Sequence, residues 1–292
     1  MQLKLEYVCY LALLGVALIG VSCLKWRLFL RAGGDDAPLL RLMRLYTIAY
    51  FVNTFTPSYI GGDVVRSYHL GVDLRSQKKA ALATVLERFT GLLAMCILGI
   101  VSVLVGTNAT RGLELSILSV GIVAVFIAAA CFSERTSAFV SATLLRILRL
   151  FRLRKLTERA EVTVAKVNDA FSVVRGDMML FLKAMALSFI YHCLTVANTY
   201  VAACSIGWCD ADFGGLFVAV PLVLLVGMAP ITPSGLGLQE GAFLFFLKRI
   251  GGTDAQALAV GVVLRVKVLI IGLIGGLLWS GLKRNVPTPH KQ

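Results

Sequence analysis

Long apolar runs separated by short polar stretches dominate the sequence. Runs of roughly 18 or more apolar residues are long enough to cross a bilayer as helices. The pattern predicts about five full spans, at residues 7–24, 80–106, 113–132, 178–204 and 254–279. Two other apolar runs, at residues 39–55 and 213–228, lead into polar breaks that contain proline and glycine. We therefore expect an all-α integral membrane protein.

The two breaks are similar in sequence. The first extends from Asn53 to Arg66 and the second from Pro230 to Gly241; both contain Thr-Pro-Ser, and in both a glycine follows the threonine by five positions. Irregular backbone is tolerated at membrane depth only where protein or a water-filled cavity covers its polar groups. We therefore predict two broken, re-entrant helical hairpins, with hairpin breaks at Pro57, Pro230 and Pro233.

A repeated spacing favours an inverted repeat. Asp63 precedes Arg88 by 25 positions, and Glu240 precedes Arg265 by the same 25. Inverted repeats whose broken helices meet near the membrane midplane are typical of transporters. A chance match of one tripeptide and one spacing is the alternative. The predicted single transmembrane domain, residues 1–292, then divides into a first half-repeat at 1–106, a connecting span and basic cytoplasmic segment at 107–177, and a second half-repeat at 178–292.

The charge distribution predicts an orientation. The chain has 29 lysine and arginine residues against 16 aspartate and glutamate residues, a net charge of +13. Because basic residues collect in cytoplasmic loops, we expect residues 25–44, residues 133–177 and the C-terminus in the cytoplasm, with the protein in a cell inner (cytoplasmic) membrane. The first hairpin then enters from the cytoplasmic side and the second from the outer side. Nucleic acid is not an expected partner, because no soluble module is present to bind it.

The basic segment at residues 135–175 has more than one interpretation. Arginines recur every third residue among leucines in its first half. On a helix this pattern suits binding to anionic lipid headgroups of the inner leaflet. A solvated linker that obeys the charge rule is equally consistent with the composition. If the protein anchors a separate glycosyltransferase, this segment is the expected docking surface.

Ionisable residues inside the predicted membrane region carry the expected chemistry, because such groups normally face a cavity or one another. We predict an anionic headgroup, a phosphate, held by arginines and by half-helix N-termini, with glycines allowing close backbone approach. Ion pairs that only fix the hairpin geometry are the alternative. The expected partners are Glu87 and Glu240 for Arg265 and Lys267, and Asp63 for Arg66 or Arg88. The candidate headgroup-binding set is Asn53, Gly61, Gly62, Asp63, Arg66, Glu87, Arg88, Gly235, Gly237, Glu240, Arg265 and Lys267.

No recognisable catalytic motif is present. The sequence lacks an Asp-x-x-x-Asp pair for Mg²⁺ and a prenyl diphosphate, a Gly-x-Ser-x-Gly motif and a His-Glu-x-x-His motif. The three histidines are isolated, and the seven cysteines show no metal-binding spacing. We therefore expect no enzyme activity, no metal and no cofactor.

The sequence resembles the lysylphosphatidylglycerol synthase transmembrane-region (flippase-like, UPF0104-type) family at four motifs: Asn53-x-Phe-x-Pro, Gly61-Gly62-Asp63-x-x-Arg66, Glu87-Arg88 and Pro230-x-x-Pro233-x-Gly235-Leu-Gly237-x-x-Glu240. The resemblance covers nearly the whole chain and implies movement of lipids or lipid-linked sugars between leaflets. It places Asp63, Arg66, Arg88 and Glu240 at the family's charged motif positions. Ser58 and Ser234 stand where many members carry glycine. The aminoacyl-transferase domain of the bifunctional members is not found here, so we do not expect synthesis of lysylphosphatidylglycerol.

The resulting hypothesis is a flippase-like transporter of lipids or lipid-linked glycans that binds an anionic headgroup between two inverted repeats. Its expected substrate is a membrane phospholipid or a polyprenyl-phosphate-linked sugar. The alternative is a non-catalytic membrane subunit that anchors or regulates a glycosyltransferase or a lipid-modifying enzyme. A lipid-modifying enzyme within the membrane is a third possibility.

Overall fold

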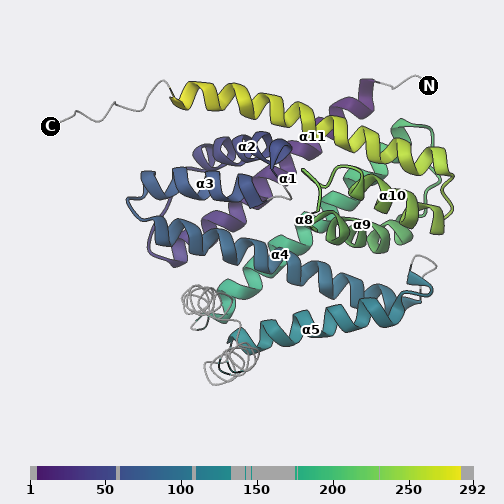
Figure 1. The fold of residues 1–292 in the computed structure, drawn as a ribbon, viewed down its shortest axis with the longest axis horizontal. Coiled ribbons are helices and arrows are strands. Elements are labelled where there is room, and N and C mark those ends of the chain that lie inside the picture. The colour runs from purple at the N-terminus through teal and green to yellow at the C-terminus, as the bar shows by residue number, and fades with distance from the viewer. Residues whose placement is uncertain are drawn as a thin grey trace.

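The computed structural model describes residues 5–56, 60–106, 110–132, 177–229 and 231–283, and the single positions 142, 146 and 175. The described residues form helices and connecting turns, without strands, which confirms the all-α prediction (Figure 1). The helices are α1 (Leu5–Ala32), α2 (Leu39–Phe55), α3 (Ile60–Asp73), α4 (Gln77–Val105), α5 (Glu114–Phe132), α8 (Met178–Ser205), α9 (Phe213–Gly227), α10 (Leu238–Arg249) and α11 (Asp254–Lys283). Pro57, Pro230 and nearly all of the basic segment at 135–175 lie outside the described residues.

Four helices, α1, α4, α8 and α11, are long and apolar enough to cross a membrane. Helix α5 has 19 residues and covers the remaining predicted span, residues 113–132. Local signals set several helix ends. The side chains of Ser76 and Asp177 accept hydrogen bonds from backbone N–H groups in the first turns of α4 and α8, which satisfies donors that a helix start leaves unpaired. Helix α4 ends at Gly106, whose φ of 73° is left-handed.

The broken helices lie between the long ones (Figure 1). Helix α1 packs along α8, α2 packs along α11, and α9 packs against α4. Helix α3 contacts both α2 and α4, and α10 contacts both α9 and α11. The order long helix, broken pair, long helix therefore occurs twice, as α1, α2–α3, α4 and as α8, α9–α10, α11, with α5 packed on α4. The division into inverted half-repeats stays a prediction.

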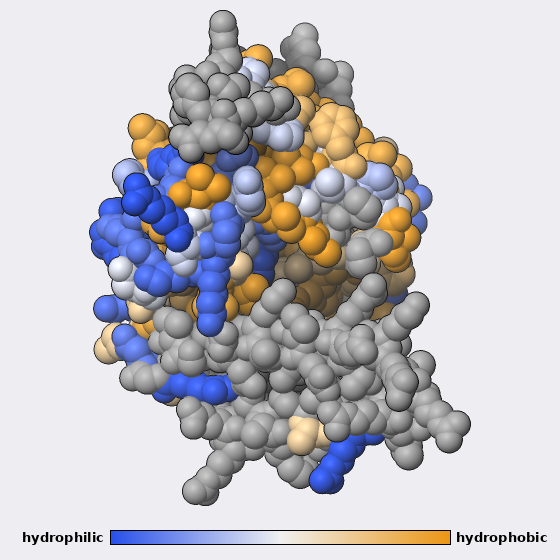
Figure 2. All heavy atoms as spheres, turned by 60° about the vertical axis from the view of Figure 1, so that its left-hand side comes forward, coloured by the Kyte–Doolittle hydropathy of each residue, from blue (hydrophilic) through white to orange (hydrophobic). Residues whose placement is uncertain are grey.

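Charged side chains tie the connections together at one end of the bundle. Asp36 accepts hydrogen bonds from Arg27 at 2.6 Å and from Arg31 at 2.9 Å, and these two guanidinium groups hold the pKa of Asp36 well below its usual range. Nearby, Asp35 pairs with Lys79 at 2.8 Å. Figure 2, which turns this end forward, shows hydrophilic residues gathered beside an apolar, hollowed surface.

Two further hydrogen bonds show which segments lie together at each end of the bundle. Arg44 at the start of α2 donates a hydrogen bond to the Leu278 carbonyl near the end of α11, so the C-terminal helix end lies with residues 25–44. At the other end, Arg249 donates to the Arg111 carbonyl at 2.9 Å. The structure thus places residues 25–44 and the last turns of α11 at one end of the bundle, while nearly all of residues 133–177 lie outside the described part of the chain. Which end faces the cytoplasm stays a prediction.

Candidate functional site

The first break is held by contacts between α2 and α3. The Asn53 side-chain oxygen accepts a hydrogen bond from the Gly62 N–H at 2.7 Å. A Cβ on Gly62 would overlap the Ala49 carbonyl oxygen, and one on Gly61 would overlap the Thr56 side chain. Glycine at these two positions therefore lets α3 start directly against α2. The sequence analysis expected these glycines to let the backbone approach a ligand. In the structure they let α3 approach α2.

The second break uses glycine for a different reason. Gly235 and Gly237 have φ values of 67° and 77°, and Ser234 between Pro233 and Gly235 has a φ of 51°. These are left-handed conformations, which glycine adopts readily and other residues rarely do. Glu240 then accepts a hydrogen bond from the Gly237 N–H at 2.8 Å and so caps the start of α10.

The two breaks meet in the structure. The Ser234 N–H donates a hydrogen bond of 3.1 Å to the Thr56 carbonyl. Both residues belong to the Thr-Pro-Ser sequences that first marked the breaks. Backbone polar groups of each break are thus satisfied partly by the other, as burial at membrane depth requires.

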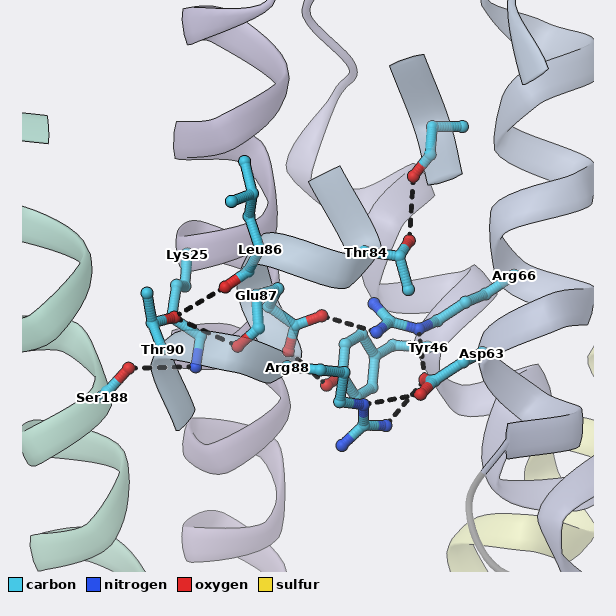
Figure 3. Close-up of polar contacts among 11 residues, drawn as sticks. Lys25, Tyr46, Asp63, Arg66, Thr84, Leu86, Glu87, Arg88, Thr90 and Ser188 are labelled. Atoms are coloured by element: carbon cyan, nitrogen blue, oxygen red, sulfur yellow. Dashed lines mark hydrogen bonds and ion pairs between the residues drawn. The ribbon is translucent and has the colours of Figure 1, made fainter. Parts of the chain in front are cut away.

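Four charged residues form a network at the first break (Figure 3). Asp63 accepts hydrogen bonds from Arg66 Nε at 2.9 Å and from Arg88 Nε and Nη2 at 2.6 and 2.7 Å. Glu87 accepts from Arg66 Nη2 at 2.5 Å and from the Tyr46 hydroxyl at 2.9 Å. Asp63 therefore takes both of the arginines between which the sequence left the choice open.

Arg66 is enclosed on every side. Its guanidinium carbon lies 4.4 Å from the ring centroids of both Trp26 and Tyr46, and its side chain is 0% exposed. A cation held between two aromatic faces and two carboxylates is compensated in place. In this conformation Arg66 therefore positions Asp63 and Glu87 and has no surface to offer a ligand.

The second break carries a smaller network. Arg265 Nε donates to Glu240 at 2.6 Å, and Arg265 Nη1 donates to the Ser234 carbonyl at 2.8 Å. Arg265 Nη2 also reaches the Gly235 carbonyl at 3.3 Å. The guanidinium thus binds two carbonyl groups of the irregular backbone, of which that of Gly235 also accepts a hydrogen bond from the Gln239 N–H at 2.9 Å.

The expected partner of Lys267 was wrong. Its ammonium donates a hydrogen bond of 2.5 Å to the Asn198 side-chain oxygen and pairs with neither Glu87 nor Glu240. The reason is geometric: Glu87 is occupied by Arg66 and Tyr46, and Glu240 by Arg265 and the start of α10. Lys267 therefore has a neutral partner.

Lys25 was missed by the sequence analysis. It directly follows the apolar run 7–24 and was placed with the cytoplasmic residues, but α1 continues to Ala32 and buries Lys25 to 4% exposure. Its ammonium donates to the Ser188 hydroxyl at 3.1 Å. The signal that could have placed it is Trp26, Phe29 and Leu30, which keep the helix apolar beyond the basic residue.

A cavity of about 200 Å³ lies between the two breaks. Arg88 faces it and keeps a side-chain exposure of 38%, although it lies within the bundle. The predicted residues that line it are Asn53, Glu87, Arg88, Glu240, Arg265 and Lys267; residues not predicted include Ser22, Lys25, Tyr46, His192, Asn198 and Gln239. The lining does not include the predicted residues Gly61, Gly62, Asp63, Arg66, Gly235 and Gly237.

The site carries more cations than carboxylates. Within the described part of the chain, five basic side chains line the cavity or pair with its lining, against three acidic ones, an excess of 5 − 3 = 2. Each arginine is paired with a carboxylate, so the excess is that of the two lysines. The described residues hold no group of three or more His, Cys, Asp or Glu side chains that could bind a metal. The arrangement therefore suits an anion. The cations are Lys25, Arg66, Arg88, Arg265 and Lys267, and the carboxylates are Asp63, Glu87 and Glu240.

Comparisons with known proteins agree with this architecture. Two proteins of Methanothermobacter thermautotrophicus, each called "UPF0104 membrane protein", are 26% identical to the chain. One alignment covers 89% of this chain and 80% of the relative, and the other covers 88% and 79%. No solved structure matches. The sequence profile of the family described as "Lysylphosphatidylglycerol synthase TM region" matches residues 3–276. The chain is therefore a multi-pass membrane protein that belongs to this family.

Proposed function

We propose that this protein is a flippase-like transporter that moves an anionic lipid, or a sugar carried on a lipid phosphate, between membrane leaflets. The observation that carries the proposal is the cavity between the two breaks, whose lining has two lysines that pair with no carboxylate of the described residues. An uncompensated ammonium is unfavourable in a low-dielectric interior. A phosphate would supply the missing charge, while the lipid tails remain in the bilayer.

The paired arginines fit the same proposal. Arg88 keeps one face toward the cavity while Asp63 holds its other side. Arg265 likewise lines the cavity and is held by Glu240. Arginines fixed in this way are preorganised, so little side-chain entropy is lost when an anion arrives. Such preorganisation supports binding of a headgroup and not of the lipid tails.

The orientation and the repeat belong to the proposal as well. We place the end that carries residues 25–44 in the cytoplasm of a cell inner membrane, following the charge rule. We also treat α1–α4 and α8–α11 as inverted half-repeats around the cavity, which is the arrangement that alternating access uses. Cysteine labelling at Ser58 and Ser234 tests both points. Labelling of the two positions from the same side only would contradict the inverted repeat.

Transport can be tested in reconstituted vesicles. The protein would be placed in liposomes with tail-labelled phosphatidylglycerol or tail-labelled polyprenyl phosphate, with an uncharged galactosyl diacylglycerol as the comparison lipid. We expect faster leaflet exchange of at least one anionic lipid, and loss of that effect in the Lys25→Met, Lys267→Met double variant. Lys183→Met is the matched control, because this lysine is exposed on α8 and does not line the cavity.

The opposite result is equally clear. If neither anionic lipid exchanges faster than in protein-free vesicles, the transport proposal fails. The protein would then be better described as a membrane subunit that anchors or regulates another enzyme. The family comparisons name no catalytic function for this region.

A further inference from the structure

Lys25 and Lys267 have the same incomplete bonding. Each ammonium donates one hydrogen bond to a neutral side chain, Ser188 or Asn198. An ammonium can donate three, and neither lysine is ion-paired with a residue that the structure describes. The two arginines that line the same cavity are both paired with carboxylates. The lysines are therefore the two lining cations that have no carboxylate partner among the described residues.

The two lysines lie at different depths of the cavity. Ser188 and Asn198 are ten residues apart on α8, which corresponds to about 15 Å along the helix axis. The two lysines also differ in depth along α1, because an added Cβ on Gly15, ten residues before Lys25, would lie 3.9 Å from Lys267 Nζ. Phosphate oxygens accept hydrogen bonds from donors about 3 Å away. One phosphate therefore cannot bind both lysines at once.

Lys25 shares its part of the cavity with an arginine. A Cβ on Gly91 would lie 3.4 Å from Lys25 Nζ, and Gly91 follows Arg88 by three positions, about one turn, on α4. Lys267 and Arg265 are two positions apart on α11, and both line the cavity. Side chains two positions apart on a helix do not face each other, so Arg265 is not paired with Lys267. The cavity thus has a first cationic group, Lys25 with Arg88, and a second, Lys267 beside Asn198.

We propose that Lys25 with Arg88, and Lys267 beside Asn198, form two successive phosphate-binding stations, about 15 Å apart along α8, between which a lipid headgroup moves. The first station lies toward the end of the bundle that carries residues 25–44, since Lys25 is seven residues from the end of α1. The second lies between α1, α8 and α11, where Lys267 contacts Asn198 and approaches Gly15. This inference rests on the proposed function and adds that the headgroup pauses at two places.

The test is a binding titration with a defined probe. Dioctanoyl phosphatidate in detergent would be titrated against wild type, Lys25→Met, Lys267→Met and the double variant, with affinities read by native mass spectrometry. Methionine keeps most of the apolar length of lysine, so packing is largely preserved. Lys183→Met again controls for the general loss of a lysine. Thermal unfolding of each variant checks that it is folded.

Two alternative stations and one shared site give different results. If either lysine can bind the probe alone, one substitution leaves the other station intact, and the double variant loses more affinity than the product of the two single losses. We expect roughly twofold loss in each single variant and about 10- to 100-fold loss in the double variant, as expected for removal of a charge-assisted hydrogen bond. Headgroup density beside the remaining lysine, in electron cryomicroscopy of each single variant, would locate the stations.

Other outcomes overturn the inference. Single losses that multiply to the double loss indicate one site touched by both lysines. A double variant that binds like wild type shows that the lysines do not bind the headgroup. Both results leave anion binding itself intact. If wild type binds neither phosphatidate nor polyprenyl phosphate, the proposed function fails together with the stations.

Discussion

In the first broken region Asp63 pairs with Arg88, and in the second Glu240 pairs with Arg265. The positions differ by the same number, since 240 − 63 = 177 and 265 − 88 = 177. At this offset Arg66 and Glu87 correspond to Phe243 and Leu264. The first region thus has a buried ion pair, Arg66 with Glu87, at the positions where the second region has two buried apolar side chains. Both regions have a carboxylate–arginine pair at the 25-position spacing. The additional pair, Arg66 with Glu87, is found in the first region and not in the second.

The glycines of the two broken regions also have different structural roles. Gly61 and Gly62 allow two helices to touch, whereas Gly235 and Gly237 allow backbone angles that other residues avoid. The same residue type at matching places therefore serves steric fit in one break and conformation in the other. Similar breaks in sequence do not imply the same local structure.

The largest expected effect comes from the additional ion pair. Arg66→Phe or Glu87→Leu alone leaves a buried charge without its partner and should lower the free energy of unfolding by about 3–5 kcal/mol. The double variant copies the second region and should recover most of that loss, because apolar residues often replace a buried ion pair at little cost. The free energy can be measured by SDS titration in mixed micelles. Additive losses in the double variant would contradict this comparison.

A smaller loss is expected from Gly62→Ala. The added Cβ would overlap the Ala49 carbonyl, so α3 must move away from α2, at about 3 kcal/mol, near the upper end for overpacking. Gly241→Ala on α10 is the matched control, since no atom lies within 4 Å of an added Cβ there. The same titration measures both. Equal stability of the two variants would show that the contact between α2 and α3 is not tight.

The two shared pairs should respond unequally to loss of their arginine. Arg88→Gln leaves Asp63 paired with Arg66, and should lower stability by about 1 kcal/mol. Arg265→Gln leaves Glu240 with only the Gly237 N–H and should lower it by about 2 kcal/mol, below the full effect of a buried pair because both side chains are partly exposed. Equal losses of stability in Arg88→Gln and Arg265→Gln would contradict the expected difference between the two regions.

The smallest effect is expected outside the membrane region, at Asp36. Arg27 and Arg31 lower the pKa of this carboxyl group, so its contribution to stability is complete above about pH 4 and is lost as the pH falls through the lowered value. The side chain is exposed, so Asp36→Asn should shift the melting temperature less than any change above. Melting curves at neutral and acidic pH check the sign: the variant should differ from wild type only at neutral pH.

The sequence predicted the helical class and most charged residues of the site, because charges inside apolar runs are conspicuous. The 25-position spacing was used to predict a repeat, and in the structure the carboxylate and arginine at that spacing are also paired in both regions. Lys25 was missed because a basic residue directly after an apolar run looks like the end of a span. The Lys267 partner could not be predicted, since Asn198 is neutral and lies within an apolar helix. Such contacts depend on how α8 packs against α1 and α11, which no local pattern encodes.

The central claim is that the cavity between the breaks holds a lipid phosphate. The most direct measurement is native mass spectrometry of the protein purified gently from its own membrane, compared with the Lys25→Met, Lys267→Met double variant and with Lys183→Met. The account predicts that an anionic lipid stays bound to wild type and to Lys183→Met and is lost from the double variant. The same lipids on all three proteins would contradict it.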